Sequence, residues 1–243
     1  YALMVFRIIN IKKIVTWSPK INKLIELHNQ QILVKNGVIK DIAEKVDSTD
    51  IEYDAKGAVL TPGFIDSHTH PIFFGNRGSE YEMRVAGKSY HEIAKLGGGI
   101  LSSINGVRSV SENELYEYCA NHINFFLTNG TTTIEAKSGY GLTLEDELKS
   151  LRIIKRLNND TDLDLIPTFM GAHDFPKEFK EDHQGYIELI CNEMIPAVAK
   201  ENLAEYCDVF CENGYFTISQ THQIYDAASQ NGLKLRLHAD EFQ

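Results

Sequence analysis

Two histidines stand two residues apart in residues 61–70, which read TPGFIDSHTH. The residues before them are apolar, and they predict a β-strand over about residues 58–66. Side chains two apart on a strand point to the same side, so His68 and His70 would aim their rings at one point. Imidazole is a common protein ligand of zinc and similar ions. The strand before the pair favours a metal site over two polar loop histidines.

Composition limits the classes of protein that the chain can belong to. It has 243 residues, 43% of them hydrophobic, and a formal net charge of -10. The acidic balance argues against nucleic-acid binding, since no basic face could dominate the surface. No run of about 18 apolar residues predicts a membrane span, and the basic-then-apolar start of a secretory signal is missing. We therefore expect a cytoplasmic protein that binds neither nucleic acid nor membrane.

The four cysteines are scattered along the chain, at Cys119, Cys191, Cys207 and Cys211. A chain of this length needs no disulfides for stability, so we interpret them as reduced thiols of a cytoplasmic protein. Cys207 and Cys211 bracket a predicted strand and could be mistaken for a metal-binding pair. Free cysteines of this kind are more typical of a protein core, and we favour that interpretation.

Residues 1–60 alternate short β-rich runs with turn residues. Asn36 and Gly37 lie between two such runs and form a strong hairpin signal. The pattern predicts a small β-sandwich-like domain over residues 1–60, which leads directly into the strand of the histidine pair.

From Ser111 onward the pattern changes to alternating helices and strands. Ser111 and Glu114 predict a capping box for a helix that ends at Asn129-Gly130. Further helices are expected from Thr143, over 184–200 and from Thr217, with strands over 131–136, 163–170, 207–211 and 233–239. Strands that alternate with helices form parallel sheets, whose active sites lie at the carboxyl ends of the strands.

Polar side chains follow the end of each predicted strand. The first strand ends in His68 and His70, and the others end in EAKSGYG (135–141), GAHD (171–174), CENG (211–214) and HADE (238–241). Because these ends share one edge of a parallel sheet, we expect the side chains to collect there. Glu135 and Lys137 fit a structural ion pair across the mouth of a barrel.

This arrangement resembles the amidohydrolase superfamily, whose members place a metal site in a (β/α)8 TIM-type barrel beside a small β domain. The resemblance implies that His68, His70 and His238 bind one divalent or trivalent metal ion, Zn or Fe. The fourth predicted barrel strand ends in Cys211 and Glu212 without the lysine of the binuclear members. This favours the mononuclear subgroup.

Several separate motifs resemble the imidazolonepropionase family in particular. They are TTIEAKSGYGL (132–142), FGNR (74–77), Tyr90, GGGI (97–100) and GAH (171–173), and the resemblance covers essentially the whole chain. It implies hydrolysis of the cyclic amide of 4-imidazolone-5-propionate to N-formimidoyl-L-glutamate, in histidine degradation. The partner is then a small-molecule substrate with a carboxylate tail.

The resemblance and the chemistry together assign roles to five residues. Glu241 is expected to contact the substrate and to relay a proton from the attacking water to the ring nitrogen. Arg77 can bind the propionate carboxylate through two parallel hydrogen bonds. Tyr140 lies in a glycine-flanked loop that can approach a ligand closely, and His173 could hydrogen-bond the ring carbonyl. Tyr90 is a further candidate for substrate contact.

A closed barrel of this class needs eight strands, whereas the sequence predicts about five. We therefore interpret residues 61–243 as an incomplete barrel of five β/α units and the chain as an N-terminal fragment. A fourth metal ligand and later active-site residues would lie outside it, and we expect the fragment alone to be inactive and to bind metal weakly. The oligomeric state stays open, with a homodimer as one candidate.

Three alternatives remain. Another amidohydrolase, such as a cyclic amidine deaminase or a cyclic imide hydrolase, would share the metal ligands but would not need Arg77 as a carboxylate anchor. A non-catalytic barrel scaffold would be expected to lose the metal ligands, which are present here. A metal-storage or metal-sensing module would concentrate its ligands in a small Cys/His-rich unit.

Overall fold

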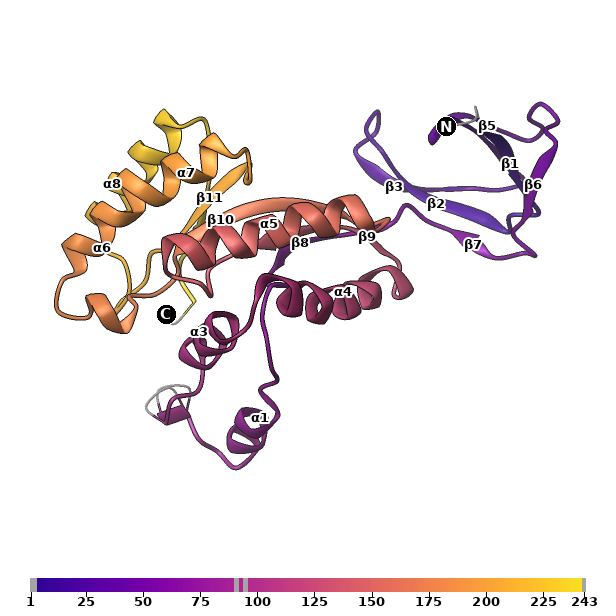
Figure 1. Cartoon of the computed structure of the whole chain (residues 1–243). Helices are drawn as coiled ribbons and strands as arrows, with labels where there is room; N and C mark the ends of the chain where they lie inside the picture. Colours follow the sequence, from indigo (N-terminus) through magenta and orange to yellow (C-terminus); the bar gives the residue numbers. More distant parts are fainter. Residues whose placement is uncertain (1–3, 90–91, 94–95, 242–243) are drawn as a thin grey trace. The chain divides into compact units, whose positions relative to one another are not determined.

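The computed structural model describes residues 4–89, 92–93 and 96–241. It divides the chain into two compact units, Tyr1–Gly63 and Phe64–Gln243, each with its own sheets (Figure 1). Among the described residues, no helix is both long enough and apolar enough to cross a membrane.

The first unit contains two small sheets. One has the strand order β5-β4-β1-β6 and the other β3-β2-β7. Their bounds are β1 Val5–Ile9, β2 Lys13–Ser18, β3 Lys23–Leu27, β4 Gln31–Lys35, β5 Val38–Ala43, β6 Ile51–Asp54 and β7 Val59–Leu60. Ile14 of β2 shares a core with Ile32 and Val34 of β4. The predicted hairpin is confirmed, since Asn36 and Gly37 join β4 to β5 with φ values of 55° and 74°.

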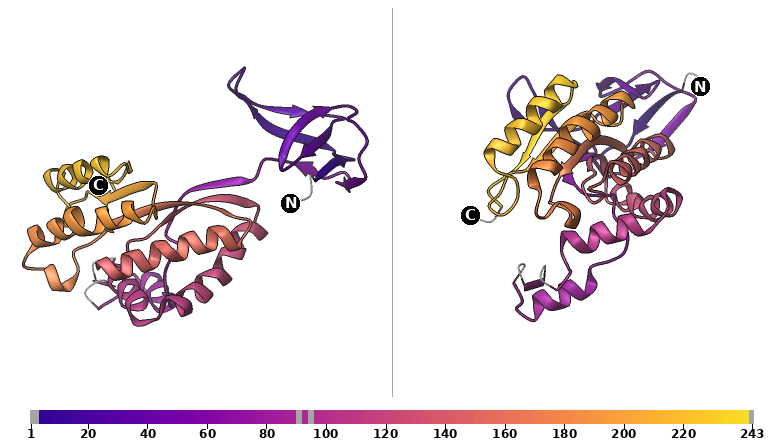
Figure 2. Two further views of the ribbon diagram at one scale, coloured as in Figure 1. Left: turned by 45° about the horizontal axis from the view of Figure 1, so that its top comes forward. Right: turned by 60° about the vertical axis from the view of Figure 1, so that its left-hand side comes forward.

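The second unit is built on one parallel sheet with the order β12-β11-β10-β9-β8. Its strands are β8 Phe64–Thr69, β9 Thr131–Lys137, β10 Asp164–Ala172, β11 Tyr206–Phe210 and β12 Lys234–His238. The connecting helices are α4 Glu112–Thr128, α5 Leu144–Asp160, α6 His183–Leu189, α7 Ile195–Lys200 and α8 Ile218–Gln230. The sheet curls into a half-barrel with these helices along its outer face (Figure 2). The predicted alternation of strands and helices is confirmed.

Local hydrogen bonds explain where these helices begin. Ser111 accepts the N–H of Glu114, whose side chain returns to Ser111, and Thr217 forms the same box with Gln220. Thr143 begins α5 by accepting the N–H of Asp146. Each such cap contributes roughly 1 kcal/mol and satisfies amides that the first helical turn leaves without partners. The predicted caps are therefore present.

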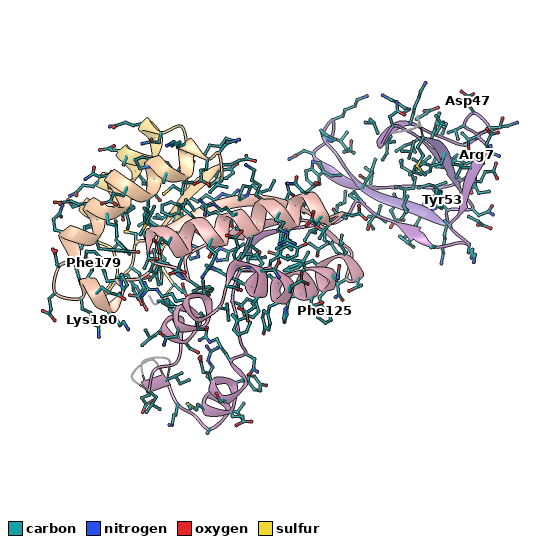
Figure 3. All side chains as sticks on the ribbon, in the orientation of Figure 1. Arg7, Asp47, Tyr53, Phe125, Phe179 and Lys180 are labelled. Atoms are coloured by element: carbon teal, nitrogen blue, oxygen red, sulfur yellow. The ribbon has the colours of Figure 1, made fainter. Side chains whose placement is uncertain are left out.

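The core of the second unit lies between the helices and the sheet, where side chains pack densely (Figure 3). Leu115 and Ile123 of α4 and Leu151 of α5 are fully buried against Ile134 of β9. Burial of such a side chain contributes about 1.5–3 kcal/mol. Phe125, on the opposite face of α4, is 67% exposed. Helix amphipathicity therefore fixes which face meets the sheet.

Three features differ from the sequence prediction. The strand expected over residues 58–66 is two strands, because Val59–Leu60 pairs with β2 in the first unit whereas Phe64–Thr69 pairs with β9 in the second. Two helices were not predicted, α1 Gly78–Val85 and α3 Ile100–Ser109. The helix expected over 184–200 contains a π-helical turn, η2, just before Pro196, whose missing N–H removes an α-helical hydrogen bond.

Candidate active site

Three histidines from opposite edges of the sheet meet at one point. His68 lies in β8 and His70 directly follows it, whereas His238 ends β12, the strand at the other edge. The curl of the sheet brings the ring centres of His68 and His238 to 4.4 Å. One nitrogen from each of the three rings lies within 4.8 Å of the others. Such spacing suits three ligands around a single ion.

The hydrogen bonds of these rings test whether a metal would fit. His238 Nδ1 lies 2.9 Å from Asp208 Oδ1, so Nδ1 donates to the carboxylate and Nε2 keeps its lone pair. Nε2 of His238 and Nδ1 of His70 are buried, and neither has a hydrogen-bond partner among the described residues. Buried polar nitrogens are normally hydrogen-bonded. Two buried nitrogens without a hydrogen-bond partner among the described residues, on neighbouring rings, therefore fit metal ligation.

The electrostatics favour neutral rings, as metal ligation requires. Burial lowers the pKa of His70 to about 2, and the neighbouring histidines act in the same direction. Burial also lowers the pKa of His68, helped by the charge of His238. Imidazole ligands suit zinc, iron and related ions alike.

A buried charge network lies beneath the histidines. The Lys137 ammonium lies 2.5 Å from Glu135 Oε1 and 2.6 Å from Asp208 Oδ2, and Arg236 also pairs with Glu135. Burial alone would raise the pKa of Asp208, but His238 and Lys137 together hold it below its usual value. The Glu135–Lys137 ion pair expected from the sequence is present. Asp208, which connects it to His238, was missed because it lies within an apolar strand.

His173 and Tyr140 line the same space. The ring of His173 stacks on that of His70 with centres 5.0 Å apart, and Tyr140 lies 5.2 Å from His173. His173 Nδ1 is 2.8 Å from the Gly139 carbonyl, which can only accept, so Nδ1 carries a hydrogen. Burial lowers the pKa of His173 to about 4. The neutral ring therefore presents Nε2 as an acceptor.

A cavity of about 290 Å³ opens beside His70 and is large enough for a small molecule. Arg77 lines it, with Nε donating to Glu80 Oε2 at 2.7 Å. Glu80 is buried and also accepts the N–H of Gly99 at 3.1 Å, so it ties Arg77 to the glycine-rich loop. The other lining residues are Phe73, Phe74, Gly75, Asn76, Ser102, Ser103 and Tyr140. Glu80 had no recognisable signal in the sequence, since it precedes no predicted element.

The structure leaves two predicted residues apart from this cluster. Glu241 is exposed three residues beyond His238, where its N–H donates to Glu212 Oε2 at 2.9 Å. Its carboxylate is not part of the three-histidine group. Tyr90 lies outside the described residues.

The fold has counterparts among solved structures. The chain is similar to the solved structure of N-isopropylammelide isopropylaminohydrolase from Burkholderia multivorans, with a TM-score of 0.64 and 16% sequence identity. The match covers 98% of this chain and 54% of that one. At this identity the likeness shows a shared fold, which in this chain is built on the curled parallel sheet.

The sequence relatives are more specific. The chain is 43% identical over 243 residues to the imidazolonepropionase of Thermoanaerobacter pseudethanolicus. The match covers 96% of this chain and 59% of that relative. It is 50% identical over 188 residues to that of Shouchella clausii, covering 77% of this chain and 42% of the relative. No protein-family model matches the chain. The chain is thus homologous to the imidazolonepropionases and spans about half the length of these curated relatives.

Proposed function

We propose that the chain carries the metal centre of an imidazolonepropionase, which hydrolyses 4-imidazolone-5-propionate to N-formimidoyl-L-glutamate in histidine degradation. One observation carries the proposal. Three histidine nitrogens lie within 4.8 Å of one another, in a chain homologous to enzymes of that name. The cytoplasm is the proposed compartment.

His68, His70 and His238 would hold one Zn or Fe ion. When bound, such an ion lowers the pKa of water to about 7 and polarises a carbonyl oxygen. Asp208 fixes the tautomer of His238 through its 2.9 Å hydrogen bond, so that Nε2 would keep its lone pair for the ion. His68 and His70 need lose no proton near neutral pH, because burial lowers the pKa of both.

The cavity beside His70 would receive the substrate. Arg77 lines it and would bind the propionate carboxylate, while Tyr140 would contact the ring. Tyr90 is proposed as a further contact. His173 Nε2, an acceptor in the neutral ring, would accept a ring N–H; donation to the ring carbonyl would need a second proton, which burial disfavours. This refines the ring contact expected from the sequence.

Glu241 is the proposed proton relay. As water adds to the carbonyl carbon, its carboxylate would take a proton from the water and pass it to the ring nitrogen while the C–N bond breaks. Its exposed position, three residues past the proposed ligand His238, supports this role.

The decisive experiment measures the loss of 4-imidazolone-5-propionate absorbance. It uses the metal-loaded protein that carries this sequence, and the 243 residues alone are assayed separately. We expect metal-dependent turnover that His70→Ala abolishes, and an Arg77→Ala variant with a raised KM and an unchanged metal content. Turnover that survives both metal removal and His70→Ala would overturn the proposal. Ammonia release from a cyclic amidine, unaffected by Arg77→Ala, would favour the deaminase alternative.

The same assay on the 243 residues alone tests the expectation that they are inactive. We expect no measurable turnover and weak metal binding. Robust turnover would contradict that expectation.

A further inference from the structure

A second buried carboxylate lies outside the metal cluster. Glu147, in the first turn of α5, is fully buried, and its carboxylate faces backward into the loop before the helix. It accepts the N–H groups of Gly139 at 3.2 Å, Gly141 at 2.8 Å and Leu142 at 2.9 Å. Among the described residues, no lysine or arginine pairs with this carboxylate. Backbone amides therefore hold this charge in place.

The loop that it holds is locally strained and tightly packed. Leu142 is buried at φ +54°, a conformation that costs a non-glycine residue about 1–2 kcal/mol. Gly139 has φ +109°, and a Cβ there would lie 2.9 Å from His173 Nδ1. Such strain persists only where the surroundings over-determine the backbone. The three amide hydrogen bonds to Glu147 provide that constraint.

The loop of residues 139–141 connects Glu147 to His173 of the candidate active site. The N–H of Gly139 belongs to the peptide unit before that residue, and the N–H of Gly141 belongs to the unit after Tyr140. Both donate to Glu147, so the planar units on either side of the Gly139 carbonyl are clamped. That carbonyl lies 2.8 Å from His173 Nδ1. The Cα of Tyr140 also lies between the clamped units.

We propose that Glu147 is a positioning residue of the active site, which fixes the Nδ1–H tautomer of His173 and the direction of Tyr140 through the clamped loop. His173 Nε2 then stays an acceptor for a substrate N–H. The inference rests on the proposed function for the substrate, but the clamp itself does not depend on it.

A glutamine cannot replace this carboxylate. Both oxygens of Glu147 accept from Gly139, and Oε1 also accepts from Gly141 and Leu142. Glutamine puts an NH2 donor in place of one oxygen, so in either orientation it faces backbone N–H donors. The loop must shift to relieve that conflict, and the Gly139 carbonyl moves with it.

The test compares Glu147→Gln with Glu145→Gln, which removes the same charge from the same helical turn at an exposed position. Protein labelled with 15N in its histidines reports the His173 tautomer by NMR, with His173→Gln for assignment. Chelator competition gives zinc affinity, and the absorbance assay gives kcat and KM. Glu147→Asp, which keeps the charge on a shorter side chain, is measured alongside.

We expect Glu147→Gln to give mixed His173 tautomers and a kcat lower by on the order of 10- to 100-fold, with zinc affinity within about twofold of the parent. Glu145→Gln should match the parent, and Glu147→Asp should fall between. An unchanged tautomer in Glu147→Gln would overturn the proposal, and so would a zinc affinity that falls with kcat. If Glu147→Gln does not fold, an unchanged tautomer in Glu147→Asp overturns it. These variants are made in the protein that carries this sequence, not in the 243 residues alone. If that metal-loaded parent shows no turnover, the proposed function fails, while the tautomer still tests the clamp.

Discussion

Two buried carboxylates support the candidate active site by different means. Asp208 sits between the Lys137 ammonium and His238, and these partners lower its pKa although burial alone would raise it. Glu147 has backbone amides as partners, and burial outweighs them and raises its pKa. One carboxylate orients His238, a proposed metal ligand, through charge pairing, and the other shapes a loop through hydrogen-bond geometry.

The largest effect is expected at Lys137, the cation that pairs with Asp208 and Glu135. Lys137→Met removes the ammonium from Glu135 and Asp208, which are both buried. Loss of one partner from a buried ionic network costs about 3–5 kcal/mol. Urea unfolding of the metal-free protein would measure that loss. The matched control is Lys234→Met on β12, because this lysine is 65% exposed and its 3.5 Å pair with Glu205 should contribute at most about 1 kcal/mol. Equal effects of the two substitutions would contradict the role given to Lys137.

A smaller effect is expected on metal affinity. Asp208→Asn keeps an acceptor for His238 Nδ1 but removes the charge that supports the ligand. Changes of this kind weaken metal binding by about 10- to 100-fold. Competition with a chromophoric chelator would detect the shift, and Glu205→Gln at the exposed end of the sheet would serve as the control. An affinity equal to that of the parent would remove Asp208 from the account.

The pH dependence of stability should have opposite signs at the two sites. The folded-state pKa of Glu147 is raised from 4.5, so the folded protein holds its proton more tightly and loses stability relative to Glu147→Gln as the pH rises above about 4.5. The pKa of Asp208 is lowered from 3.8, so its stabilisation is present above that pH and is lost as the pH falls below it. Urea unfolding of the parent, of Glu147→Gln and of Asp208→Asn between about pH 3 and pH 7 measures how the unfolding free energy changes with pH at each site. Parallel slopes would contradict the comparison.

The smallest effect concerns Ser138, which couples the clamp to the sheet. Its buried hydroxyl oxygen accepts the N–H of Met170 at 3.0 Å, and the side chain also hydrogen-bonds Glu147. Ser138→Ala leaves a buried N–H without that partner and should cost about 1–3 kcal/mol, nearer the lower value. Thermal unfolding would measure it, with exposed Ser109→Ala as the reference. A loss as large as that of Lys137→Met would place more of the stability in the loop than we propose.

Sequence patterns predicted local structure well in both units wherever neighbouring residues decide the outcome. The capping boxes at Ser111 and Thr217 and the hairpin at Asn36 depend on neighbouring residues alone. The break between β7 and β8 could not be predicted, because an apolar run does not reveal that its two halves pair with strands of different units.

The candidate site divides in the same way. His68, His70 and His238 follow strand ends and were found from that position, and the fold brings them together. Asp208 and Glu147 were missed for physical reasons. Asp208 interrupts an apolar strand, and its partner is 30 residues away in the chain. Glu147 looks like an ordinary acid favoured by the helix dipole, and its inward direction depends on the loop before it.

The most direct test is the number of zinc ions that the protein carrying this sequence, as distinct from the 243 residues alone, binds at the three histidines. Equilibrium titration against a chromophoric chelator should give one tightly bound ion per chain, and His70→Ala and His238→Ala should each lose it, whereas exposed His28→Ala should keep it. Tight binding of one ion that persists in both His70→Ala and His238→Ala would contradict the central claim.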